Sequence, residues 1–216
     1  MIPQLPIAEN LPPDFLTLPR WHAWKYQTEQ DGKVTKIPIN ANGLHADHVK
    51  ARTSLKEARQ IAEAHRGGIG FSIANAIDGS DFVFIDLDGC LNQSGGLKDW
   101  ATPILERFPG TYVQKSISST GLHILVKGTY AGPSLVTFQG KHHNIQIFNT
   151  KRFCVMTGDS HPQPVLNMQE SLNWLANYMQ EMKTSMSAKP DKRTAVNPIP
   201  SDSNKAVDRK STRLNS

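Results

Sequence analysis

Residues 81–89 decide the fold, and they read Asp-Phe-Val-Phe-Ile-Asp-Leu-Asp-Gly. The apolar residues at 82–85 have high strand propensity, so the segment predicts a buried strand. Asp86 and Asp88 are two residues apart, so they lie on one face at the end of this strand. Two neighbouring carboxylates repel each other, and a cation relieves the repulsion. Hard oxygen ligands on a rigid strand suit Mg²⁺ or Mn²⁺ carrying a substrate phosphate, which is the chemistry of nucleotidyl transfer. The alternative is that both aspartates only end the strand in a turn with Gly89.

A second polar motif, residues 116–126, reads Ser-Ile-Ser-Ser-Thr-Gly-Leu-His-Ile-Leu-Val. A turn rich in Ser, Thr and Gly lets backbone N–H groups approach phosphate oxygens closely. The strand after the turn begins by placing His123. A histidine in such a position is more often structural when it stands alone, but its combination with the carboxylate strand favours contact with a ligand. We therefore expect Ser118, Gly121 and His123 to bind a phosphate.

Further motifs follow in a fixed order. Residues 145–148 read Ile-Gln-Ile-Phe, and Arg152-Phe153 and Thr157-Gly158 come after them. With the Trp-rich opening at 21–25, this order resembles the archaeo-eukaryotic primase superfamily, and more narrowly the primase-polymerase domains of phage and plasmid replication proteins. The resemblance covers roughly residues 18–160. It implies an α+β fold, with a mixed-sheet primase-polymerase catalytic core and an RRM-like half.

The resemblance also assigns roles to residues. It implies a Mg²⁺ or Mn²⁺ site formed by Asp86, Asp88 and Gln146, and catalytic roles for Asp86, Asp88 and His123. It implies single-stranded DNA as template, nucleoside triphosphates as substrates, and a helicase domain or subunit as a possible partner. The residues expected to bind the nucleotide are Ser118, Gly121, His123, Arg152 and Lys115.

Two glutamines depart from the family pattern. Gln146 stands where relatives usually carry an acidic metal ligand, so the site loses one of three negative charges. Gln114 stands where relatives often have a glutamate, and the turn reads Ser-Ser-Thr-Gly where relatives have Ser-Gly-x-Gly. Two hypotheses follow: a primase-polymerase, or a catalytically weakened or inactive nucleotide- or DNA-binding module of a replication initiator.

Three basic residues have competing interpretations. Arg152 is a planar donor fork that can clamp a triphosphate, or it is a surface residue of a hairpin. Lys36 contacts phosphate or template, or it only solubilises an exposed strand. Lys115 lies beside the His123 turn, in a position that suits contact with DNA or triphosphate. A metal pair at His142 and His143 is disfavoured because adjacent strand residues face opposite ways.

Composition and charge distribution bear on the cellular location and the domain organisation of the protein. Apolar runs are only strand-length, and no signal-peptide pattern precedes them, so we expect a cytoplasmic protein without a membrane partner. Cys90 and Cys154 lack metal-ligand spacing and suit a reducing compartment. Residues 1–182 hold 16 basic and 16 acidic residues, whereas residues 183–216 hold 8 and 3. The sequence therefore predicts a primase-polymerase-like domain over 1–182 and a disordered basic linker or tail over 183–216.

Local patterns predict the elements. Pro103 is expected in the first turn of its helix, and all four tryptophans are expected to pack in the core. A Thr or Ser cap begins the first predicted helix, and Gly67-Gly68 ends it. We expect helices at 53–65, 96–108 and 168–182, and strands at 21–26, 33–39, 69–74, 82–88, 111–115, 123–127, 144–148 and 152–156.

Overall fold

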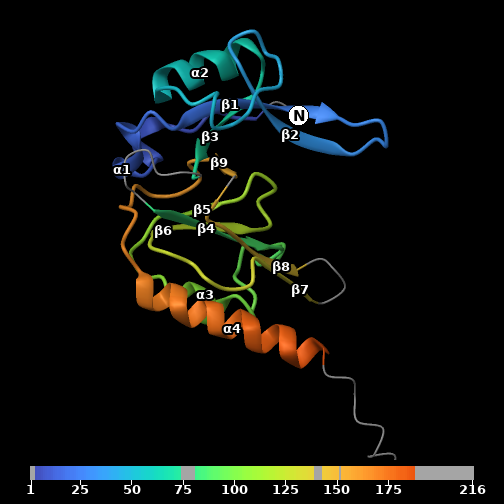
Figure 1. The fold of residues 1–216 in the computed structure, drawn as a ribbon, viewed down its shortest axis with the longest axis vertical. Helices are drawn as coiled ribbons and strands as arrows, with labels where there is room; N and C mark the ends of the chain where they lie inside the picture. Colours follow the sequence, from blue (N-terminus) through green and yellow to red (C-terminus); the bar gives the residue numbers. More distant parts are fainter. Residues whose placement is uncertain (1–2, 74–80, 139–142, 151, 188–216) are drawn as a thin grey trace, which may run out of the picture.

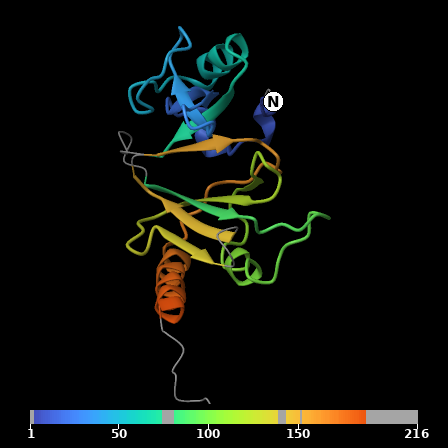
Figure 2. The same cartoon turned by 90° about the vertical axis from the view of Figure 1, so that its right-hand side faces the viewer.

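The computed structural model describes residues 3–73, 81–138, 143–150 and 152–187. Its elements form four layers: a helix, a four-stranded sheet, a five-stranded sheet and a second layer of helices (Figures 1 and 2). The α+β class expected from the sequence is therefore confirmed. No helix in the described part of the chain is long and apolar enough to cross a membrane.

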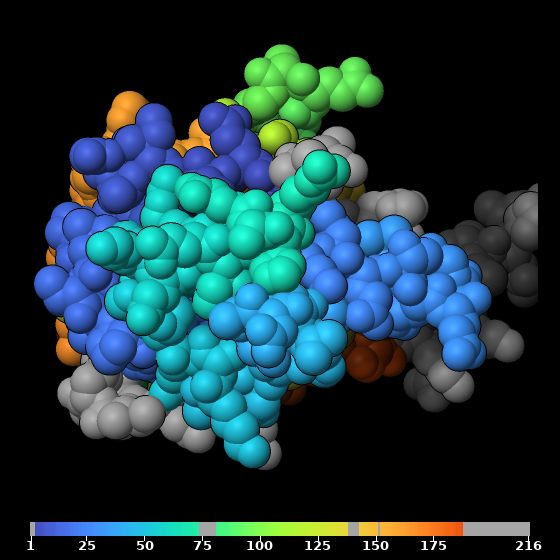
Figure 3. Space-filling view, turned by 90° about the horizontal axis from the view of Figure 1, so that it is seen from above, coloured from blue at the N-terminus to red at the C-terminus, as the bar shows by residue number. Residues whose placement is uncertain are grey.

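The upper sheet has the strand order β2-β1-β3-β9, and all of its pairings are antiparallel. Helix α2 (Leu55–Ala64) covers this sheet, and the β1–β2 hairpin projects beyond it (Figure 3). Ser54 and Glu57 close a capping box at the start of α2, as the sequence predicts. The strands are β1 (Trp21–Thr28), β2 (Val34–Ile39), β3 (Gly68–Ser72) and β9 (Phe153–Met156). A 3₁₀ turn (Ala8–Asn10) and α1 (Pro13–Leu16) precede them.

The lower sheet has the order β5-β6-β4-β8-β7 and is also antiparallel throughout. Its central strand is β4 (Phe82–Asp88), the segment that the sequence singles out. The other strands are β5 (Val113–Lys115), β6 (Leu122–Lys127), β7 (Leu135–Phe138) and β8 (His143–Phe148). Helices α3 (Thr102–Leu105) and α4 (Gln169–Ser187) lie beneath it (Figure 1).

Two apolar cores hold the layers together. In the lower core, Val83, Ile85 and Leu87 alternate along β4 and pack with residues of α3 and α4. In the upper core, the Phe15 and Phe71 rings stack with centroids 3.8 Å apart. Trp21 and Trp24 are fully buried, and Trp100 and Trp174 are partly buried against the lower core. The expectation that the tryptophans pack inward is therefore confirmed.

Four features of the structure differ from the expectations about the elements. The sheets of the described residues are antiparallel, so the expected mixed sheet is wrong. The expected helix at 96–108 shrinks to α3, because the Asn92 side chain accepts the Gly96 N–H and holds a turn there. Pro103 does lie in the first turn of α3. The edge strand β7 was not expected, and α4 continues past residue 182 to Ser187. Residues 188–216 of the expected tail, and His142, lie outside the described residues.

Candidate functional site

A row of polar side chains crosses the lower sheet at one level. In this row Gln114 of β5 lies opposite His123 of β6, His123 opposite Asp86 of β4, and Asp86 opposite Gln146 of β8. Residues directly opposite each other in antiparallel strands share a face. Val83, Ile85 and Leu87 of β4 point into the lower core, toward α3 and α4. The β4 residues between them, and therefore this row, face the upper sheet.

Asp86 and His123 of this row border a cavity of about 300 Å³ between the two sheets. Three aromatic rings, Phe84, Phe148 and Phe153, form apolar parts of its wall. The polar part of the wall comes from segments far apart in sequence, and it consists of Lys36, Asp86, Asp88, Ser116, Ser118, His123 and Arg152. The structure thus gathers the two predicted carboxylates, the histidine, the turn and two of the basic residues in one place.

Asp86 is the most perturbed group of the cavity. Its side chain is 18% exposed, and its Oδ1 atom accepts no hydrogen bond from the described residues. Burial and, to a smaller extent, the charge of Asp88 raise the pKa of Asp86 to about 7, although Lys36 opposes both effects. A buried carboxylate oxygen without a donor, next to a second carboxylate, is the environment that a cation stabilises.

His123 faces Asp86 as a neutral ring. Its Nε2 atom lies 3.8 Å from Asp86 Oδ1, too far for a hydrogen bond. Burial and the nearby charge of Lys36 together lower the pKa of His123 to about 3, although the Val155 carbonyl opposes this shift. The imidazole is therefore uncharged at neutral pH and can donate one hydrogen bond into the cavity.

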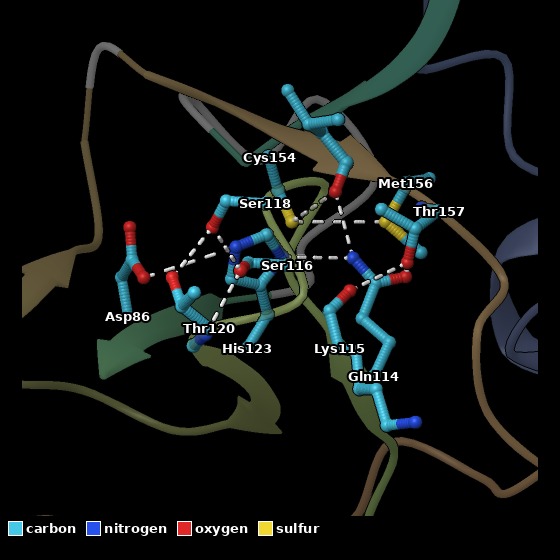
Figure 4. A network of polar contacts seen from close by, with 12 residues as sticks. Asp86, Gln114, Lys115, Ser116, Ser118, Thr120, His123, Cys154, Met156 and Thr157 are labelled. Carbon is cyan, nitrogen blue, oxygen red and sulfur yellow. Dashed lines mark hydrogen bonds and ion pairs between the residues drawn. The ribbon is translucent and has the colours of Figure 1, made fainter. Parts of the chain in front are cut away.

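The turn at 116–121 carries a chain of hydroxyl groups (Figure 4). Ser118 Oγ lies 3.0 Å from Ser116 Oγ and 2.9 Å from Thr120 Oγ1, and the Gly121 N–H donates to Ser116 Oγ at 3.1 Å. A Cβ atom at Gly121 would lie 2.7 Å from the Leu87 carbonyl, so only glycine lets this turn pack on the end of β4. The turn is thereby fixed beside Asp88.

Gln146 lies opposite Asp86 on β8, but it borders a neighbouring cavity of about 340 Å³. Arg152 borders both cavities, and its guanidinium carbon lies 5.6 Å from the centre of the Phe148 ring. Among the described residues, no cluster of three or more His, Cys, Asp or Glu side chains is placed to bind a metal. A cation in the cavity would therefore depend on two carboxylates and non-acidic ligands.

Lys115 is not brought to the cavity. It follows Gln114 on β5 and lies opposite Leu122, so it faces the other side of the sheet. In Figure 4 its ammonium group points away from the polar network. Lys36, whose role the sequence left open, does line the cavity.

Sequence reasoning noted Gln114 only as a departure from the family pattern and gave it no structural role, although this residue is only 1% exposed and its amide lies 2.9 Å from His123 Nδ1. Apart from the Tyr112 hydroxyl, its remaining partners are on β9 and in the loop after it, more than 40 residues away. The available signal was a polar residue in a strand one position before an exposed lysine. That pattern is common at sheet edges and does not identify a partner.

No protein-family model matches the chain. A similar protein is the DNA primase-polymerase of the Nitratiruptor phage NrS-1, which is 27% identical over 145 residues. The aligned stretch covers 65% of this chain and 19% of the phage protein. The similarity supports a relationship with primase-polymerases. This chain therefore matches only a small part of the length of that relative.

Proposed function

We propose that this chain is the primase-polymerase domain of a phage or plasmid replication protein, which joins nucleotides on a single-stranded DNA template. The observation that carries the proposal is the cavity between the sheets, where two carboxylates, a neutral histidine, a hydroxyl-rich turn and an arginine meet. The similarity to a phage primase-polymerase supports the same reaction class. In this proposal the lower sheet with α3 and α4 is the RRM-like half of the catalytic core.

The residues present fit a divalent cation. Asp86 and Asp88 would hold Mg²⁺ or Mn²⁺, and the amide oxygen of Gln146 would be an uncharged third ligand. The bound ion would stabilise the charge of the transferring phosphate and activate the attacking 3′-hydroxyl. The buried, unpartnered Asp86 Oδ1 is the observation that supports this assignment.

The remaining residues bind and orient the substrate. The turn at 116–121 offers hydroxyl groups and His123 offers an N–H to the β- and γ-phosphates of an incoming triphosphate. Arg152 is held at the rim by Phe148 and would add a charged donor fork. Lys115 faces away, so it would contact DNA and not the triphosphate. The expected setting is the cytoplasm, with a helicase domain or subunit nearby.

Primer synthesis is the decisive experiment. The protein is incubated with single-stranded DNA, labelled ribonucleotides or deoxynucleotides, and Mg²⁺ or Mn²⁺. We expect metal-dependent incorporation that Asp88→Asn abolishes, while Asp99→Asn, a change at an exposed aspartate, leaves incorporation intact. Thermal melting confirms that each variant is folded. Metal-dependent nucleotide binding without any incorporation would overturn the polymerase proposal and assign the chain to the binding-module class.

A further inference from the structure

Gln114 lies at the centre of a fully satisfied hydrogen-bond network (Figure 4). Its Oε1 atom accepts the backbone N–H groups of Thr157 at 3.1 Å and Gly158 at 3.3 Å, and the Tyr112 hydroxyl at 3.2 Å. Its Nε2 atom donates to the Val155 carbonyl at 2.7 Å and lies 2.9 Å from His123 Nδ1. Every polar atom of this buried amide thus has a partner.

These partners fix which way the amide points. Backbone N–H groups can only donate, so the atom that faces Thr157 and Gly158 must be the amide oxygen. A flipped amide would set its NH₂ group against two donors and its oxygen against the Val155 carbonyl. Such a flip leaves several buried groups unsatisfied, which the protein avoids.

The orientation of the amide determines the protonation of the histidine. Gln114 Nε2 carries only hydrogens and no acceptor, so its contact with His123 requires a lone pair on Nδ1. A neutral imidazole with an unprotonated Nδ1 carries its proton on Nε2. This Nε2–H is on the side of the ring that faces Asp86 and the cavity.

We propose that Gln114 is a positioning residue that holds His123 as the neutral Nε2–H tautomer, so that the ring always offers a donor to a ligand phosphate. The phosphate ligand rests on the function proposed above, whereas the tautomer does not. Gln114 acts only through His123, because it does not border the cavity. The same amide joins β5 to the loop after β9, so it also fixes the distance between the two sheets at this point.

The amide has a chemical advantage over a carboxylate at this position. A glutamate would set an anionic oxygen against the Val155 carbonyl and against Nδ1. His123 relieves the repulsion at Nδ1 either by moving its proton from Nε2 to Nδ1, which removes the donor from the cavity, or by taking up a second proton to become an imidazolium. The glutamine therefore keeps the donor without adding charge beside Asp86.

Nitrogen-15 NMR of the histidine rings in the intact protein tests the tautomer directly. We expect the His123 signals of a protonated Nε2 and an unprotonated Nδ1 from pH 6 to pH 8. Gln114→Met, which keeps length and apolar packing, should produce a mixture of tautomers, and it should weaken binding of a nonhydrolysable nucleotide roughly twofold to tenfold as the competent fraction falls. Gln114→Glu should shift the His123 proton from Nε2 toward Nδ1, because a carboxylate at this position accepts a hydrogen bond from Nδ1. Gln163→Met, at an exposed glutamine, is the matched control and should change neither signal.

The outcomes separate the two proposals. A protonated Nδ1 in the parent protein would overturn the role of Gln114, and this result needs no variant to fold. An unchanged tautomer in Gln114→Met would also overturn it. If the expected tautomer is found but no nucleotide binds, the assignment of Gln114 stands and the proposed function fails.

Discussion

Two aspartates in this protein sit in opposite electrostatic environments. Asp14, in α1, accepts hydrogen bonds from Lys127 Nζ and from the Val165 N–H, both at 2.8 Å. Burial alone would raise its pKa, but these two donors outweigh burial, and the pKa falls below its usual value. Asp86 is more shielded from water, with a side chain 18% exposed against 29% for Asp14, and its Oδ1 has no donor, so its pKa rises to about 7.

The two aspartates therefore have opposite effects on the stability of the native state. The Asp14 contacts tie the N-terminal segment to β6 and to the strand-like segment before α4, so they stabilise the native state. Asp86 destabilises the native state whenever it is ionised without a cation. A buried acid that costs stability is a candidate functional group, because packing alone gives no reason to retain it.

The largest effect is expected from Asp86→Asn. Nucleotide incorporation should fall by a factor of about 10³ or more if Asp86 holds the cation. The metal-free variant should nevertheless be more stable than the parent at pH 8, by up to about 4 kcal/mol for a pKa displaced by roughly three units.

The sign follows from proton binding. Between pH 4 and 7 the native state keeps a proton on Asp86 that the unfolded state has released, so this group lowers parent stability as pH rises. The difference in the free energy of unfolding between the parent and Asp86→Asn should therefore be small at pH 4 and reach its maximum above pH 7. Urea titrations of the parent and the variant at pH 4, 6 and 8 measure this difference. A variant less stable than the parent at pH 8 would contradict the environment described for Asp86.

The next largest effect is expected from Gln146→Glu. A third carboxylate opposite Asp86 should tighten cation binding and raise Mn²⁺-dependent incorporation about tenfold, because a more firmly held ion stabilises the transferring phosphate better. Without metal the same change should lower the Tm through repulsion between like charges.

The metal-induced rise in Tm should therefore be larger in Gln146→Glu than in the parent, and melts with and without Mn²⁺ measure it. Gln163→Glu controls for an added charge at an exposed site. If Gln146→Glu changes neither quantity, Gln146 does not contribute to the cation site and its cavity serves another ligand.

The sequence predicts where Asp86 and Asp88 lie on β4, but it does not predict which groups surround Asp86. The alternation in β4 predicts a shared face for Asp86 and Asp88, and the strand register confirms it. The environment of Asp86 could not be predicted, because its burial depends on β2 and β9, which are distant in sequence. The edge strand β7 follows the turn signal Gly132-Pro133, but its four residues are too short a run to show strand periodicity, so it escaped prediction.

A smaller effect is expected from Asp14→Asn. The amide can accept only one of the two hydrogen bonds well and has no charge to pair with Lys127, so the free energy of unfolding should fall by about 1–2 kcal/mol at pH 7. Nucleotide incorporation should be unchanged, in contrast to Asp86→Asn.

The pKa of Asp14 is lowered in the native state, so its stabilising contribution is present above pH 4 and is lost as the pH falls further. The parent and Asp14→Asn should therefore converge in stability at low pH, whereas the parent and Asp86→Asn diverge toward high pH. Urea titrations over the same pH series measure both trends. A loss of activity in Asp14→Asn would show that the Asp14–Lys127 contact shapes the cavity and is not only structural.

The smallest effect is expected from Ser119→Gly, in the turn beside the cavity. Ser119 has a φ of +58°, a left-handed conformation that costs a residue with a Cβ atom roughly 1–2 kcal/mol. Glycine removes this cost but gains about 0.5–1 kcal/mol of conformational freedom in the unfolded chain, so the net stabilisation should be about 0.5 kcal/mol. The Ser119 side chain is exposed, whereas Ser118 and Gly121 make the contacts of the turn, so nucleotide binding should not change.

Thr120→Gly in the same turn should change stability in the opposite direction, because Thr120 has no positive φ to relieve and loses its hydrogen bond to Ser118. Urea midpoints of the two variants therefore separate strain relief from a general effect of glycine: equal destabilisation by both would show that Ser119 is not strained in solution.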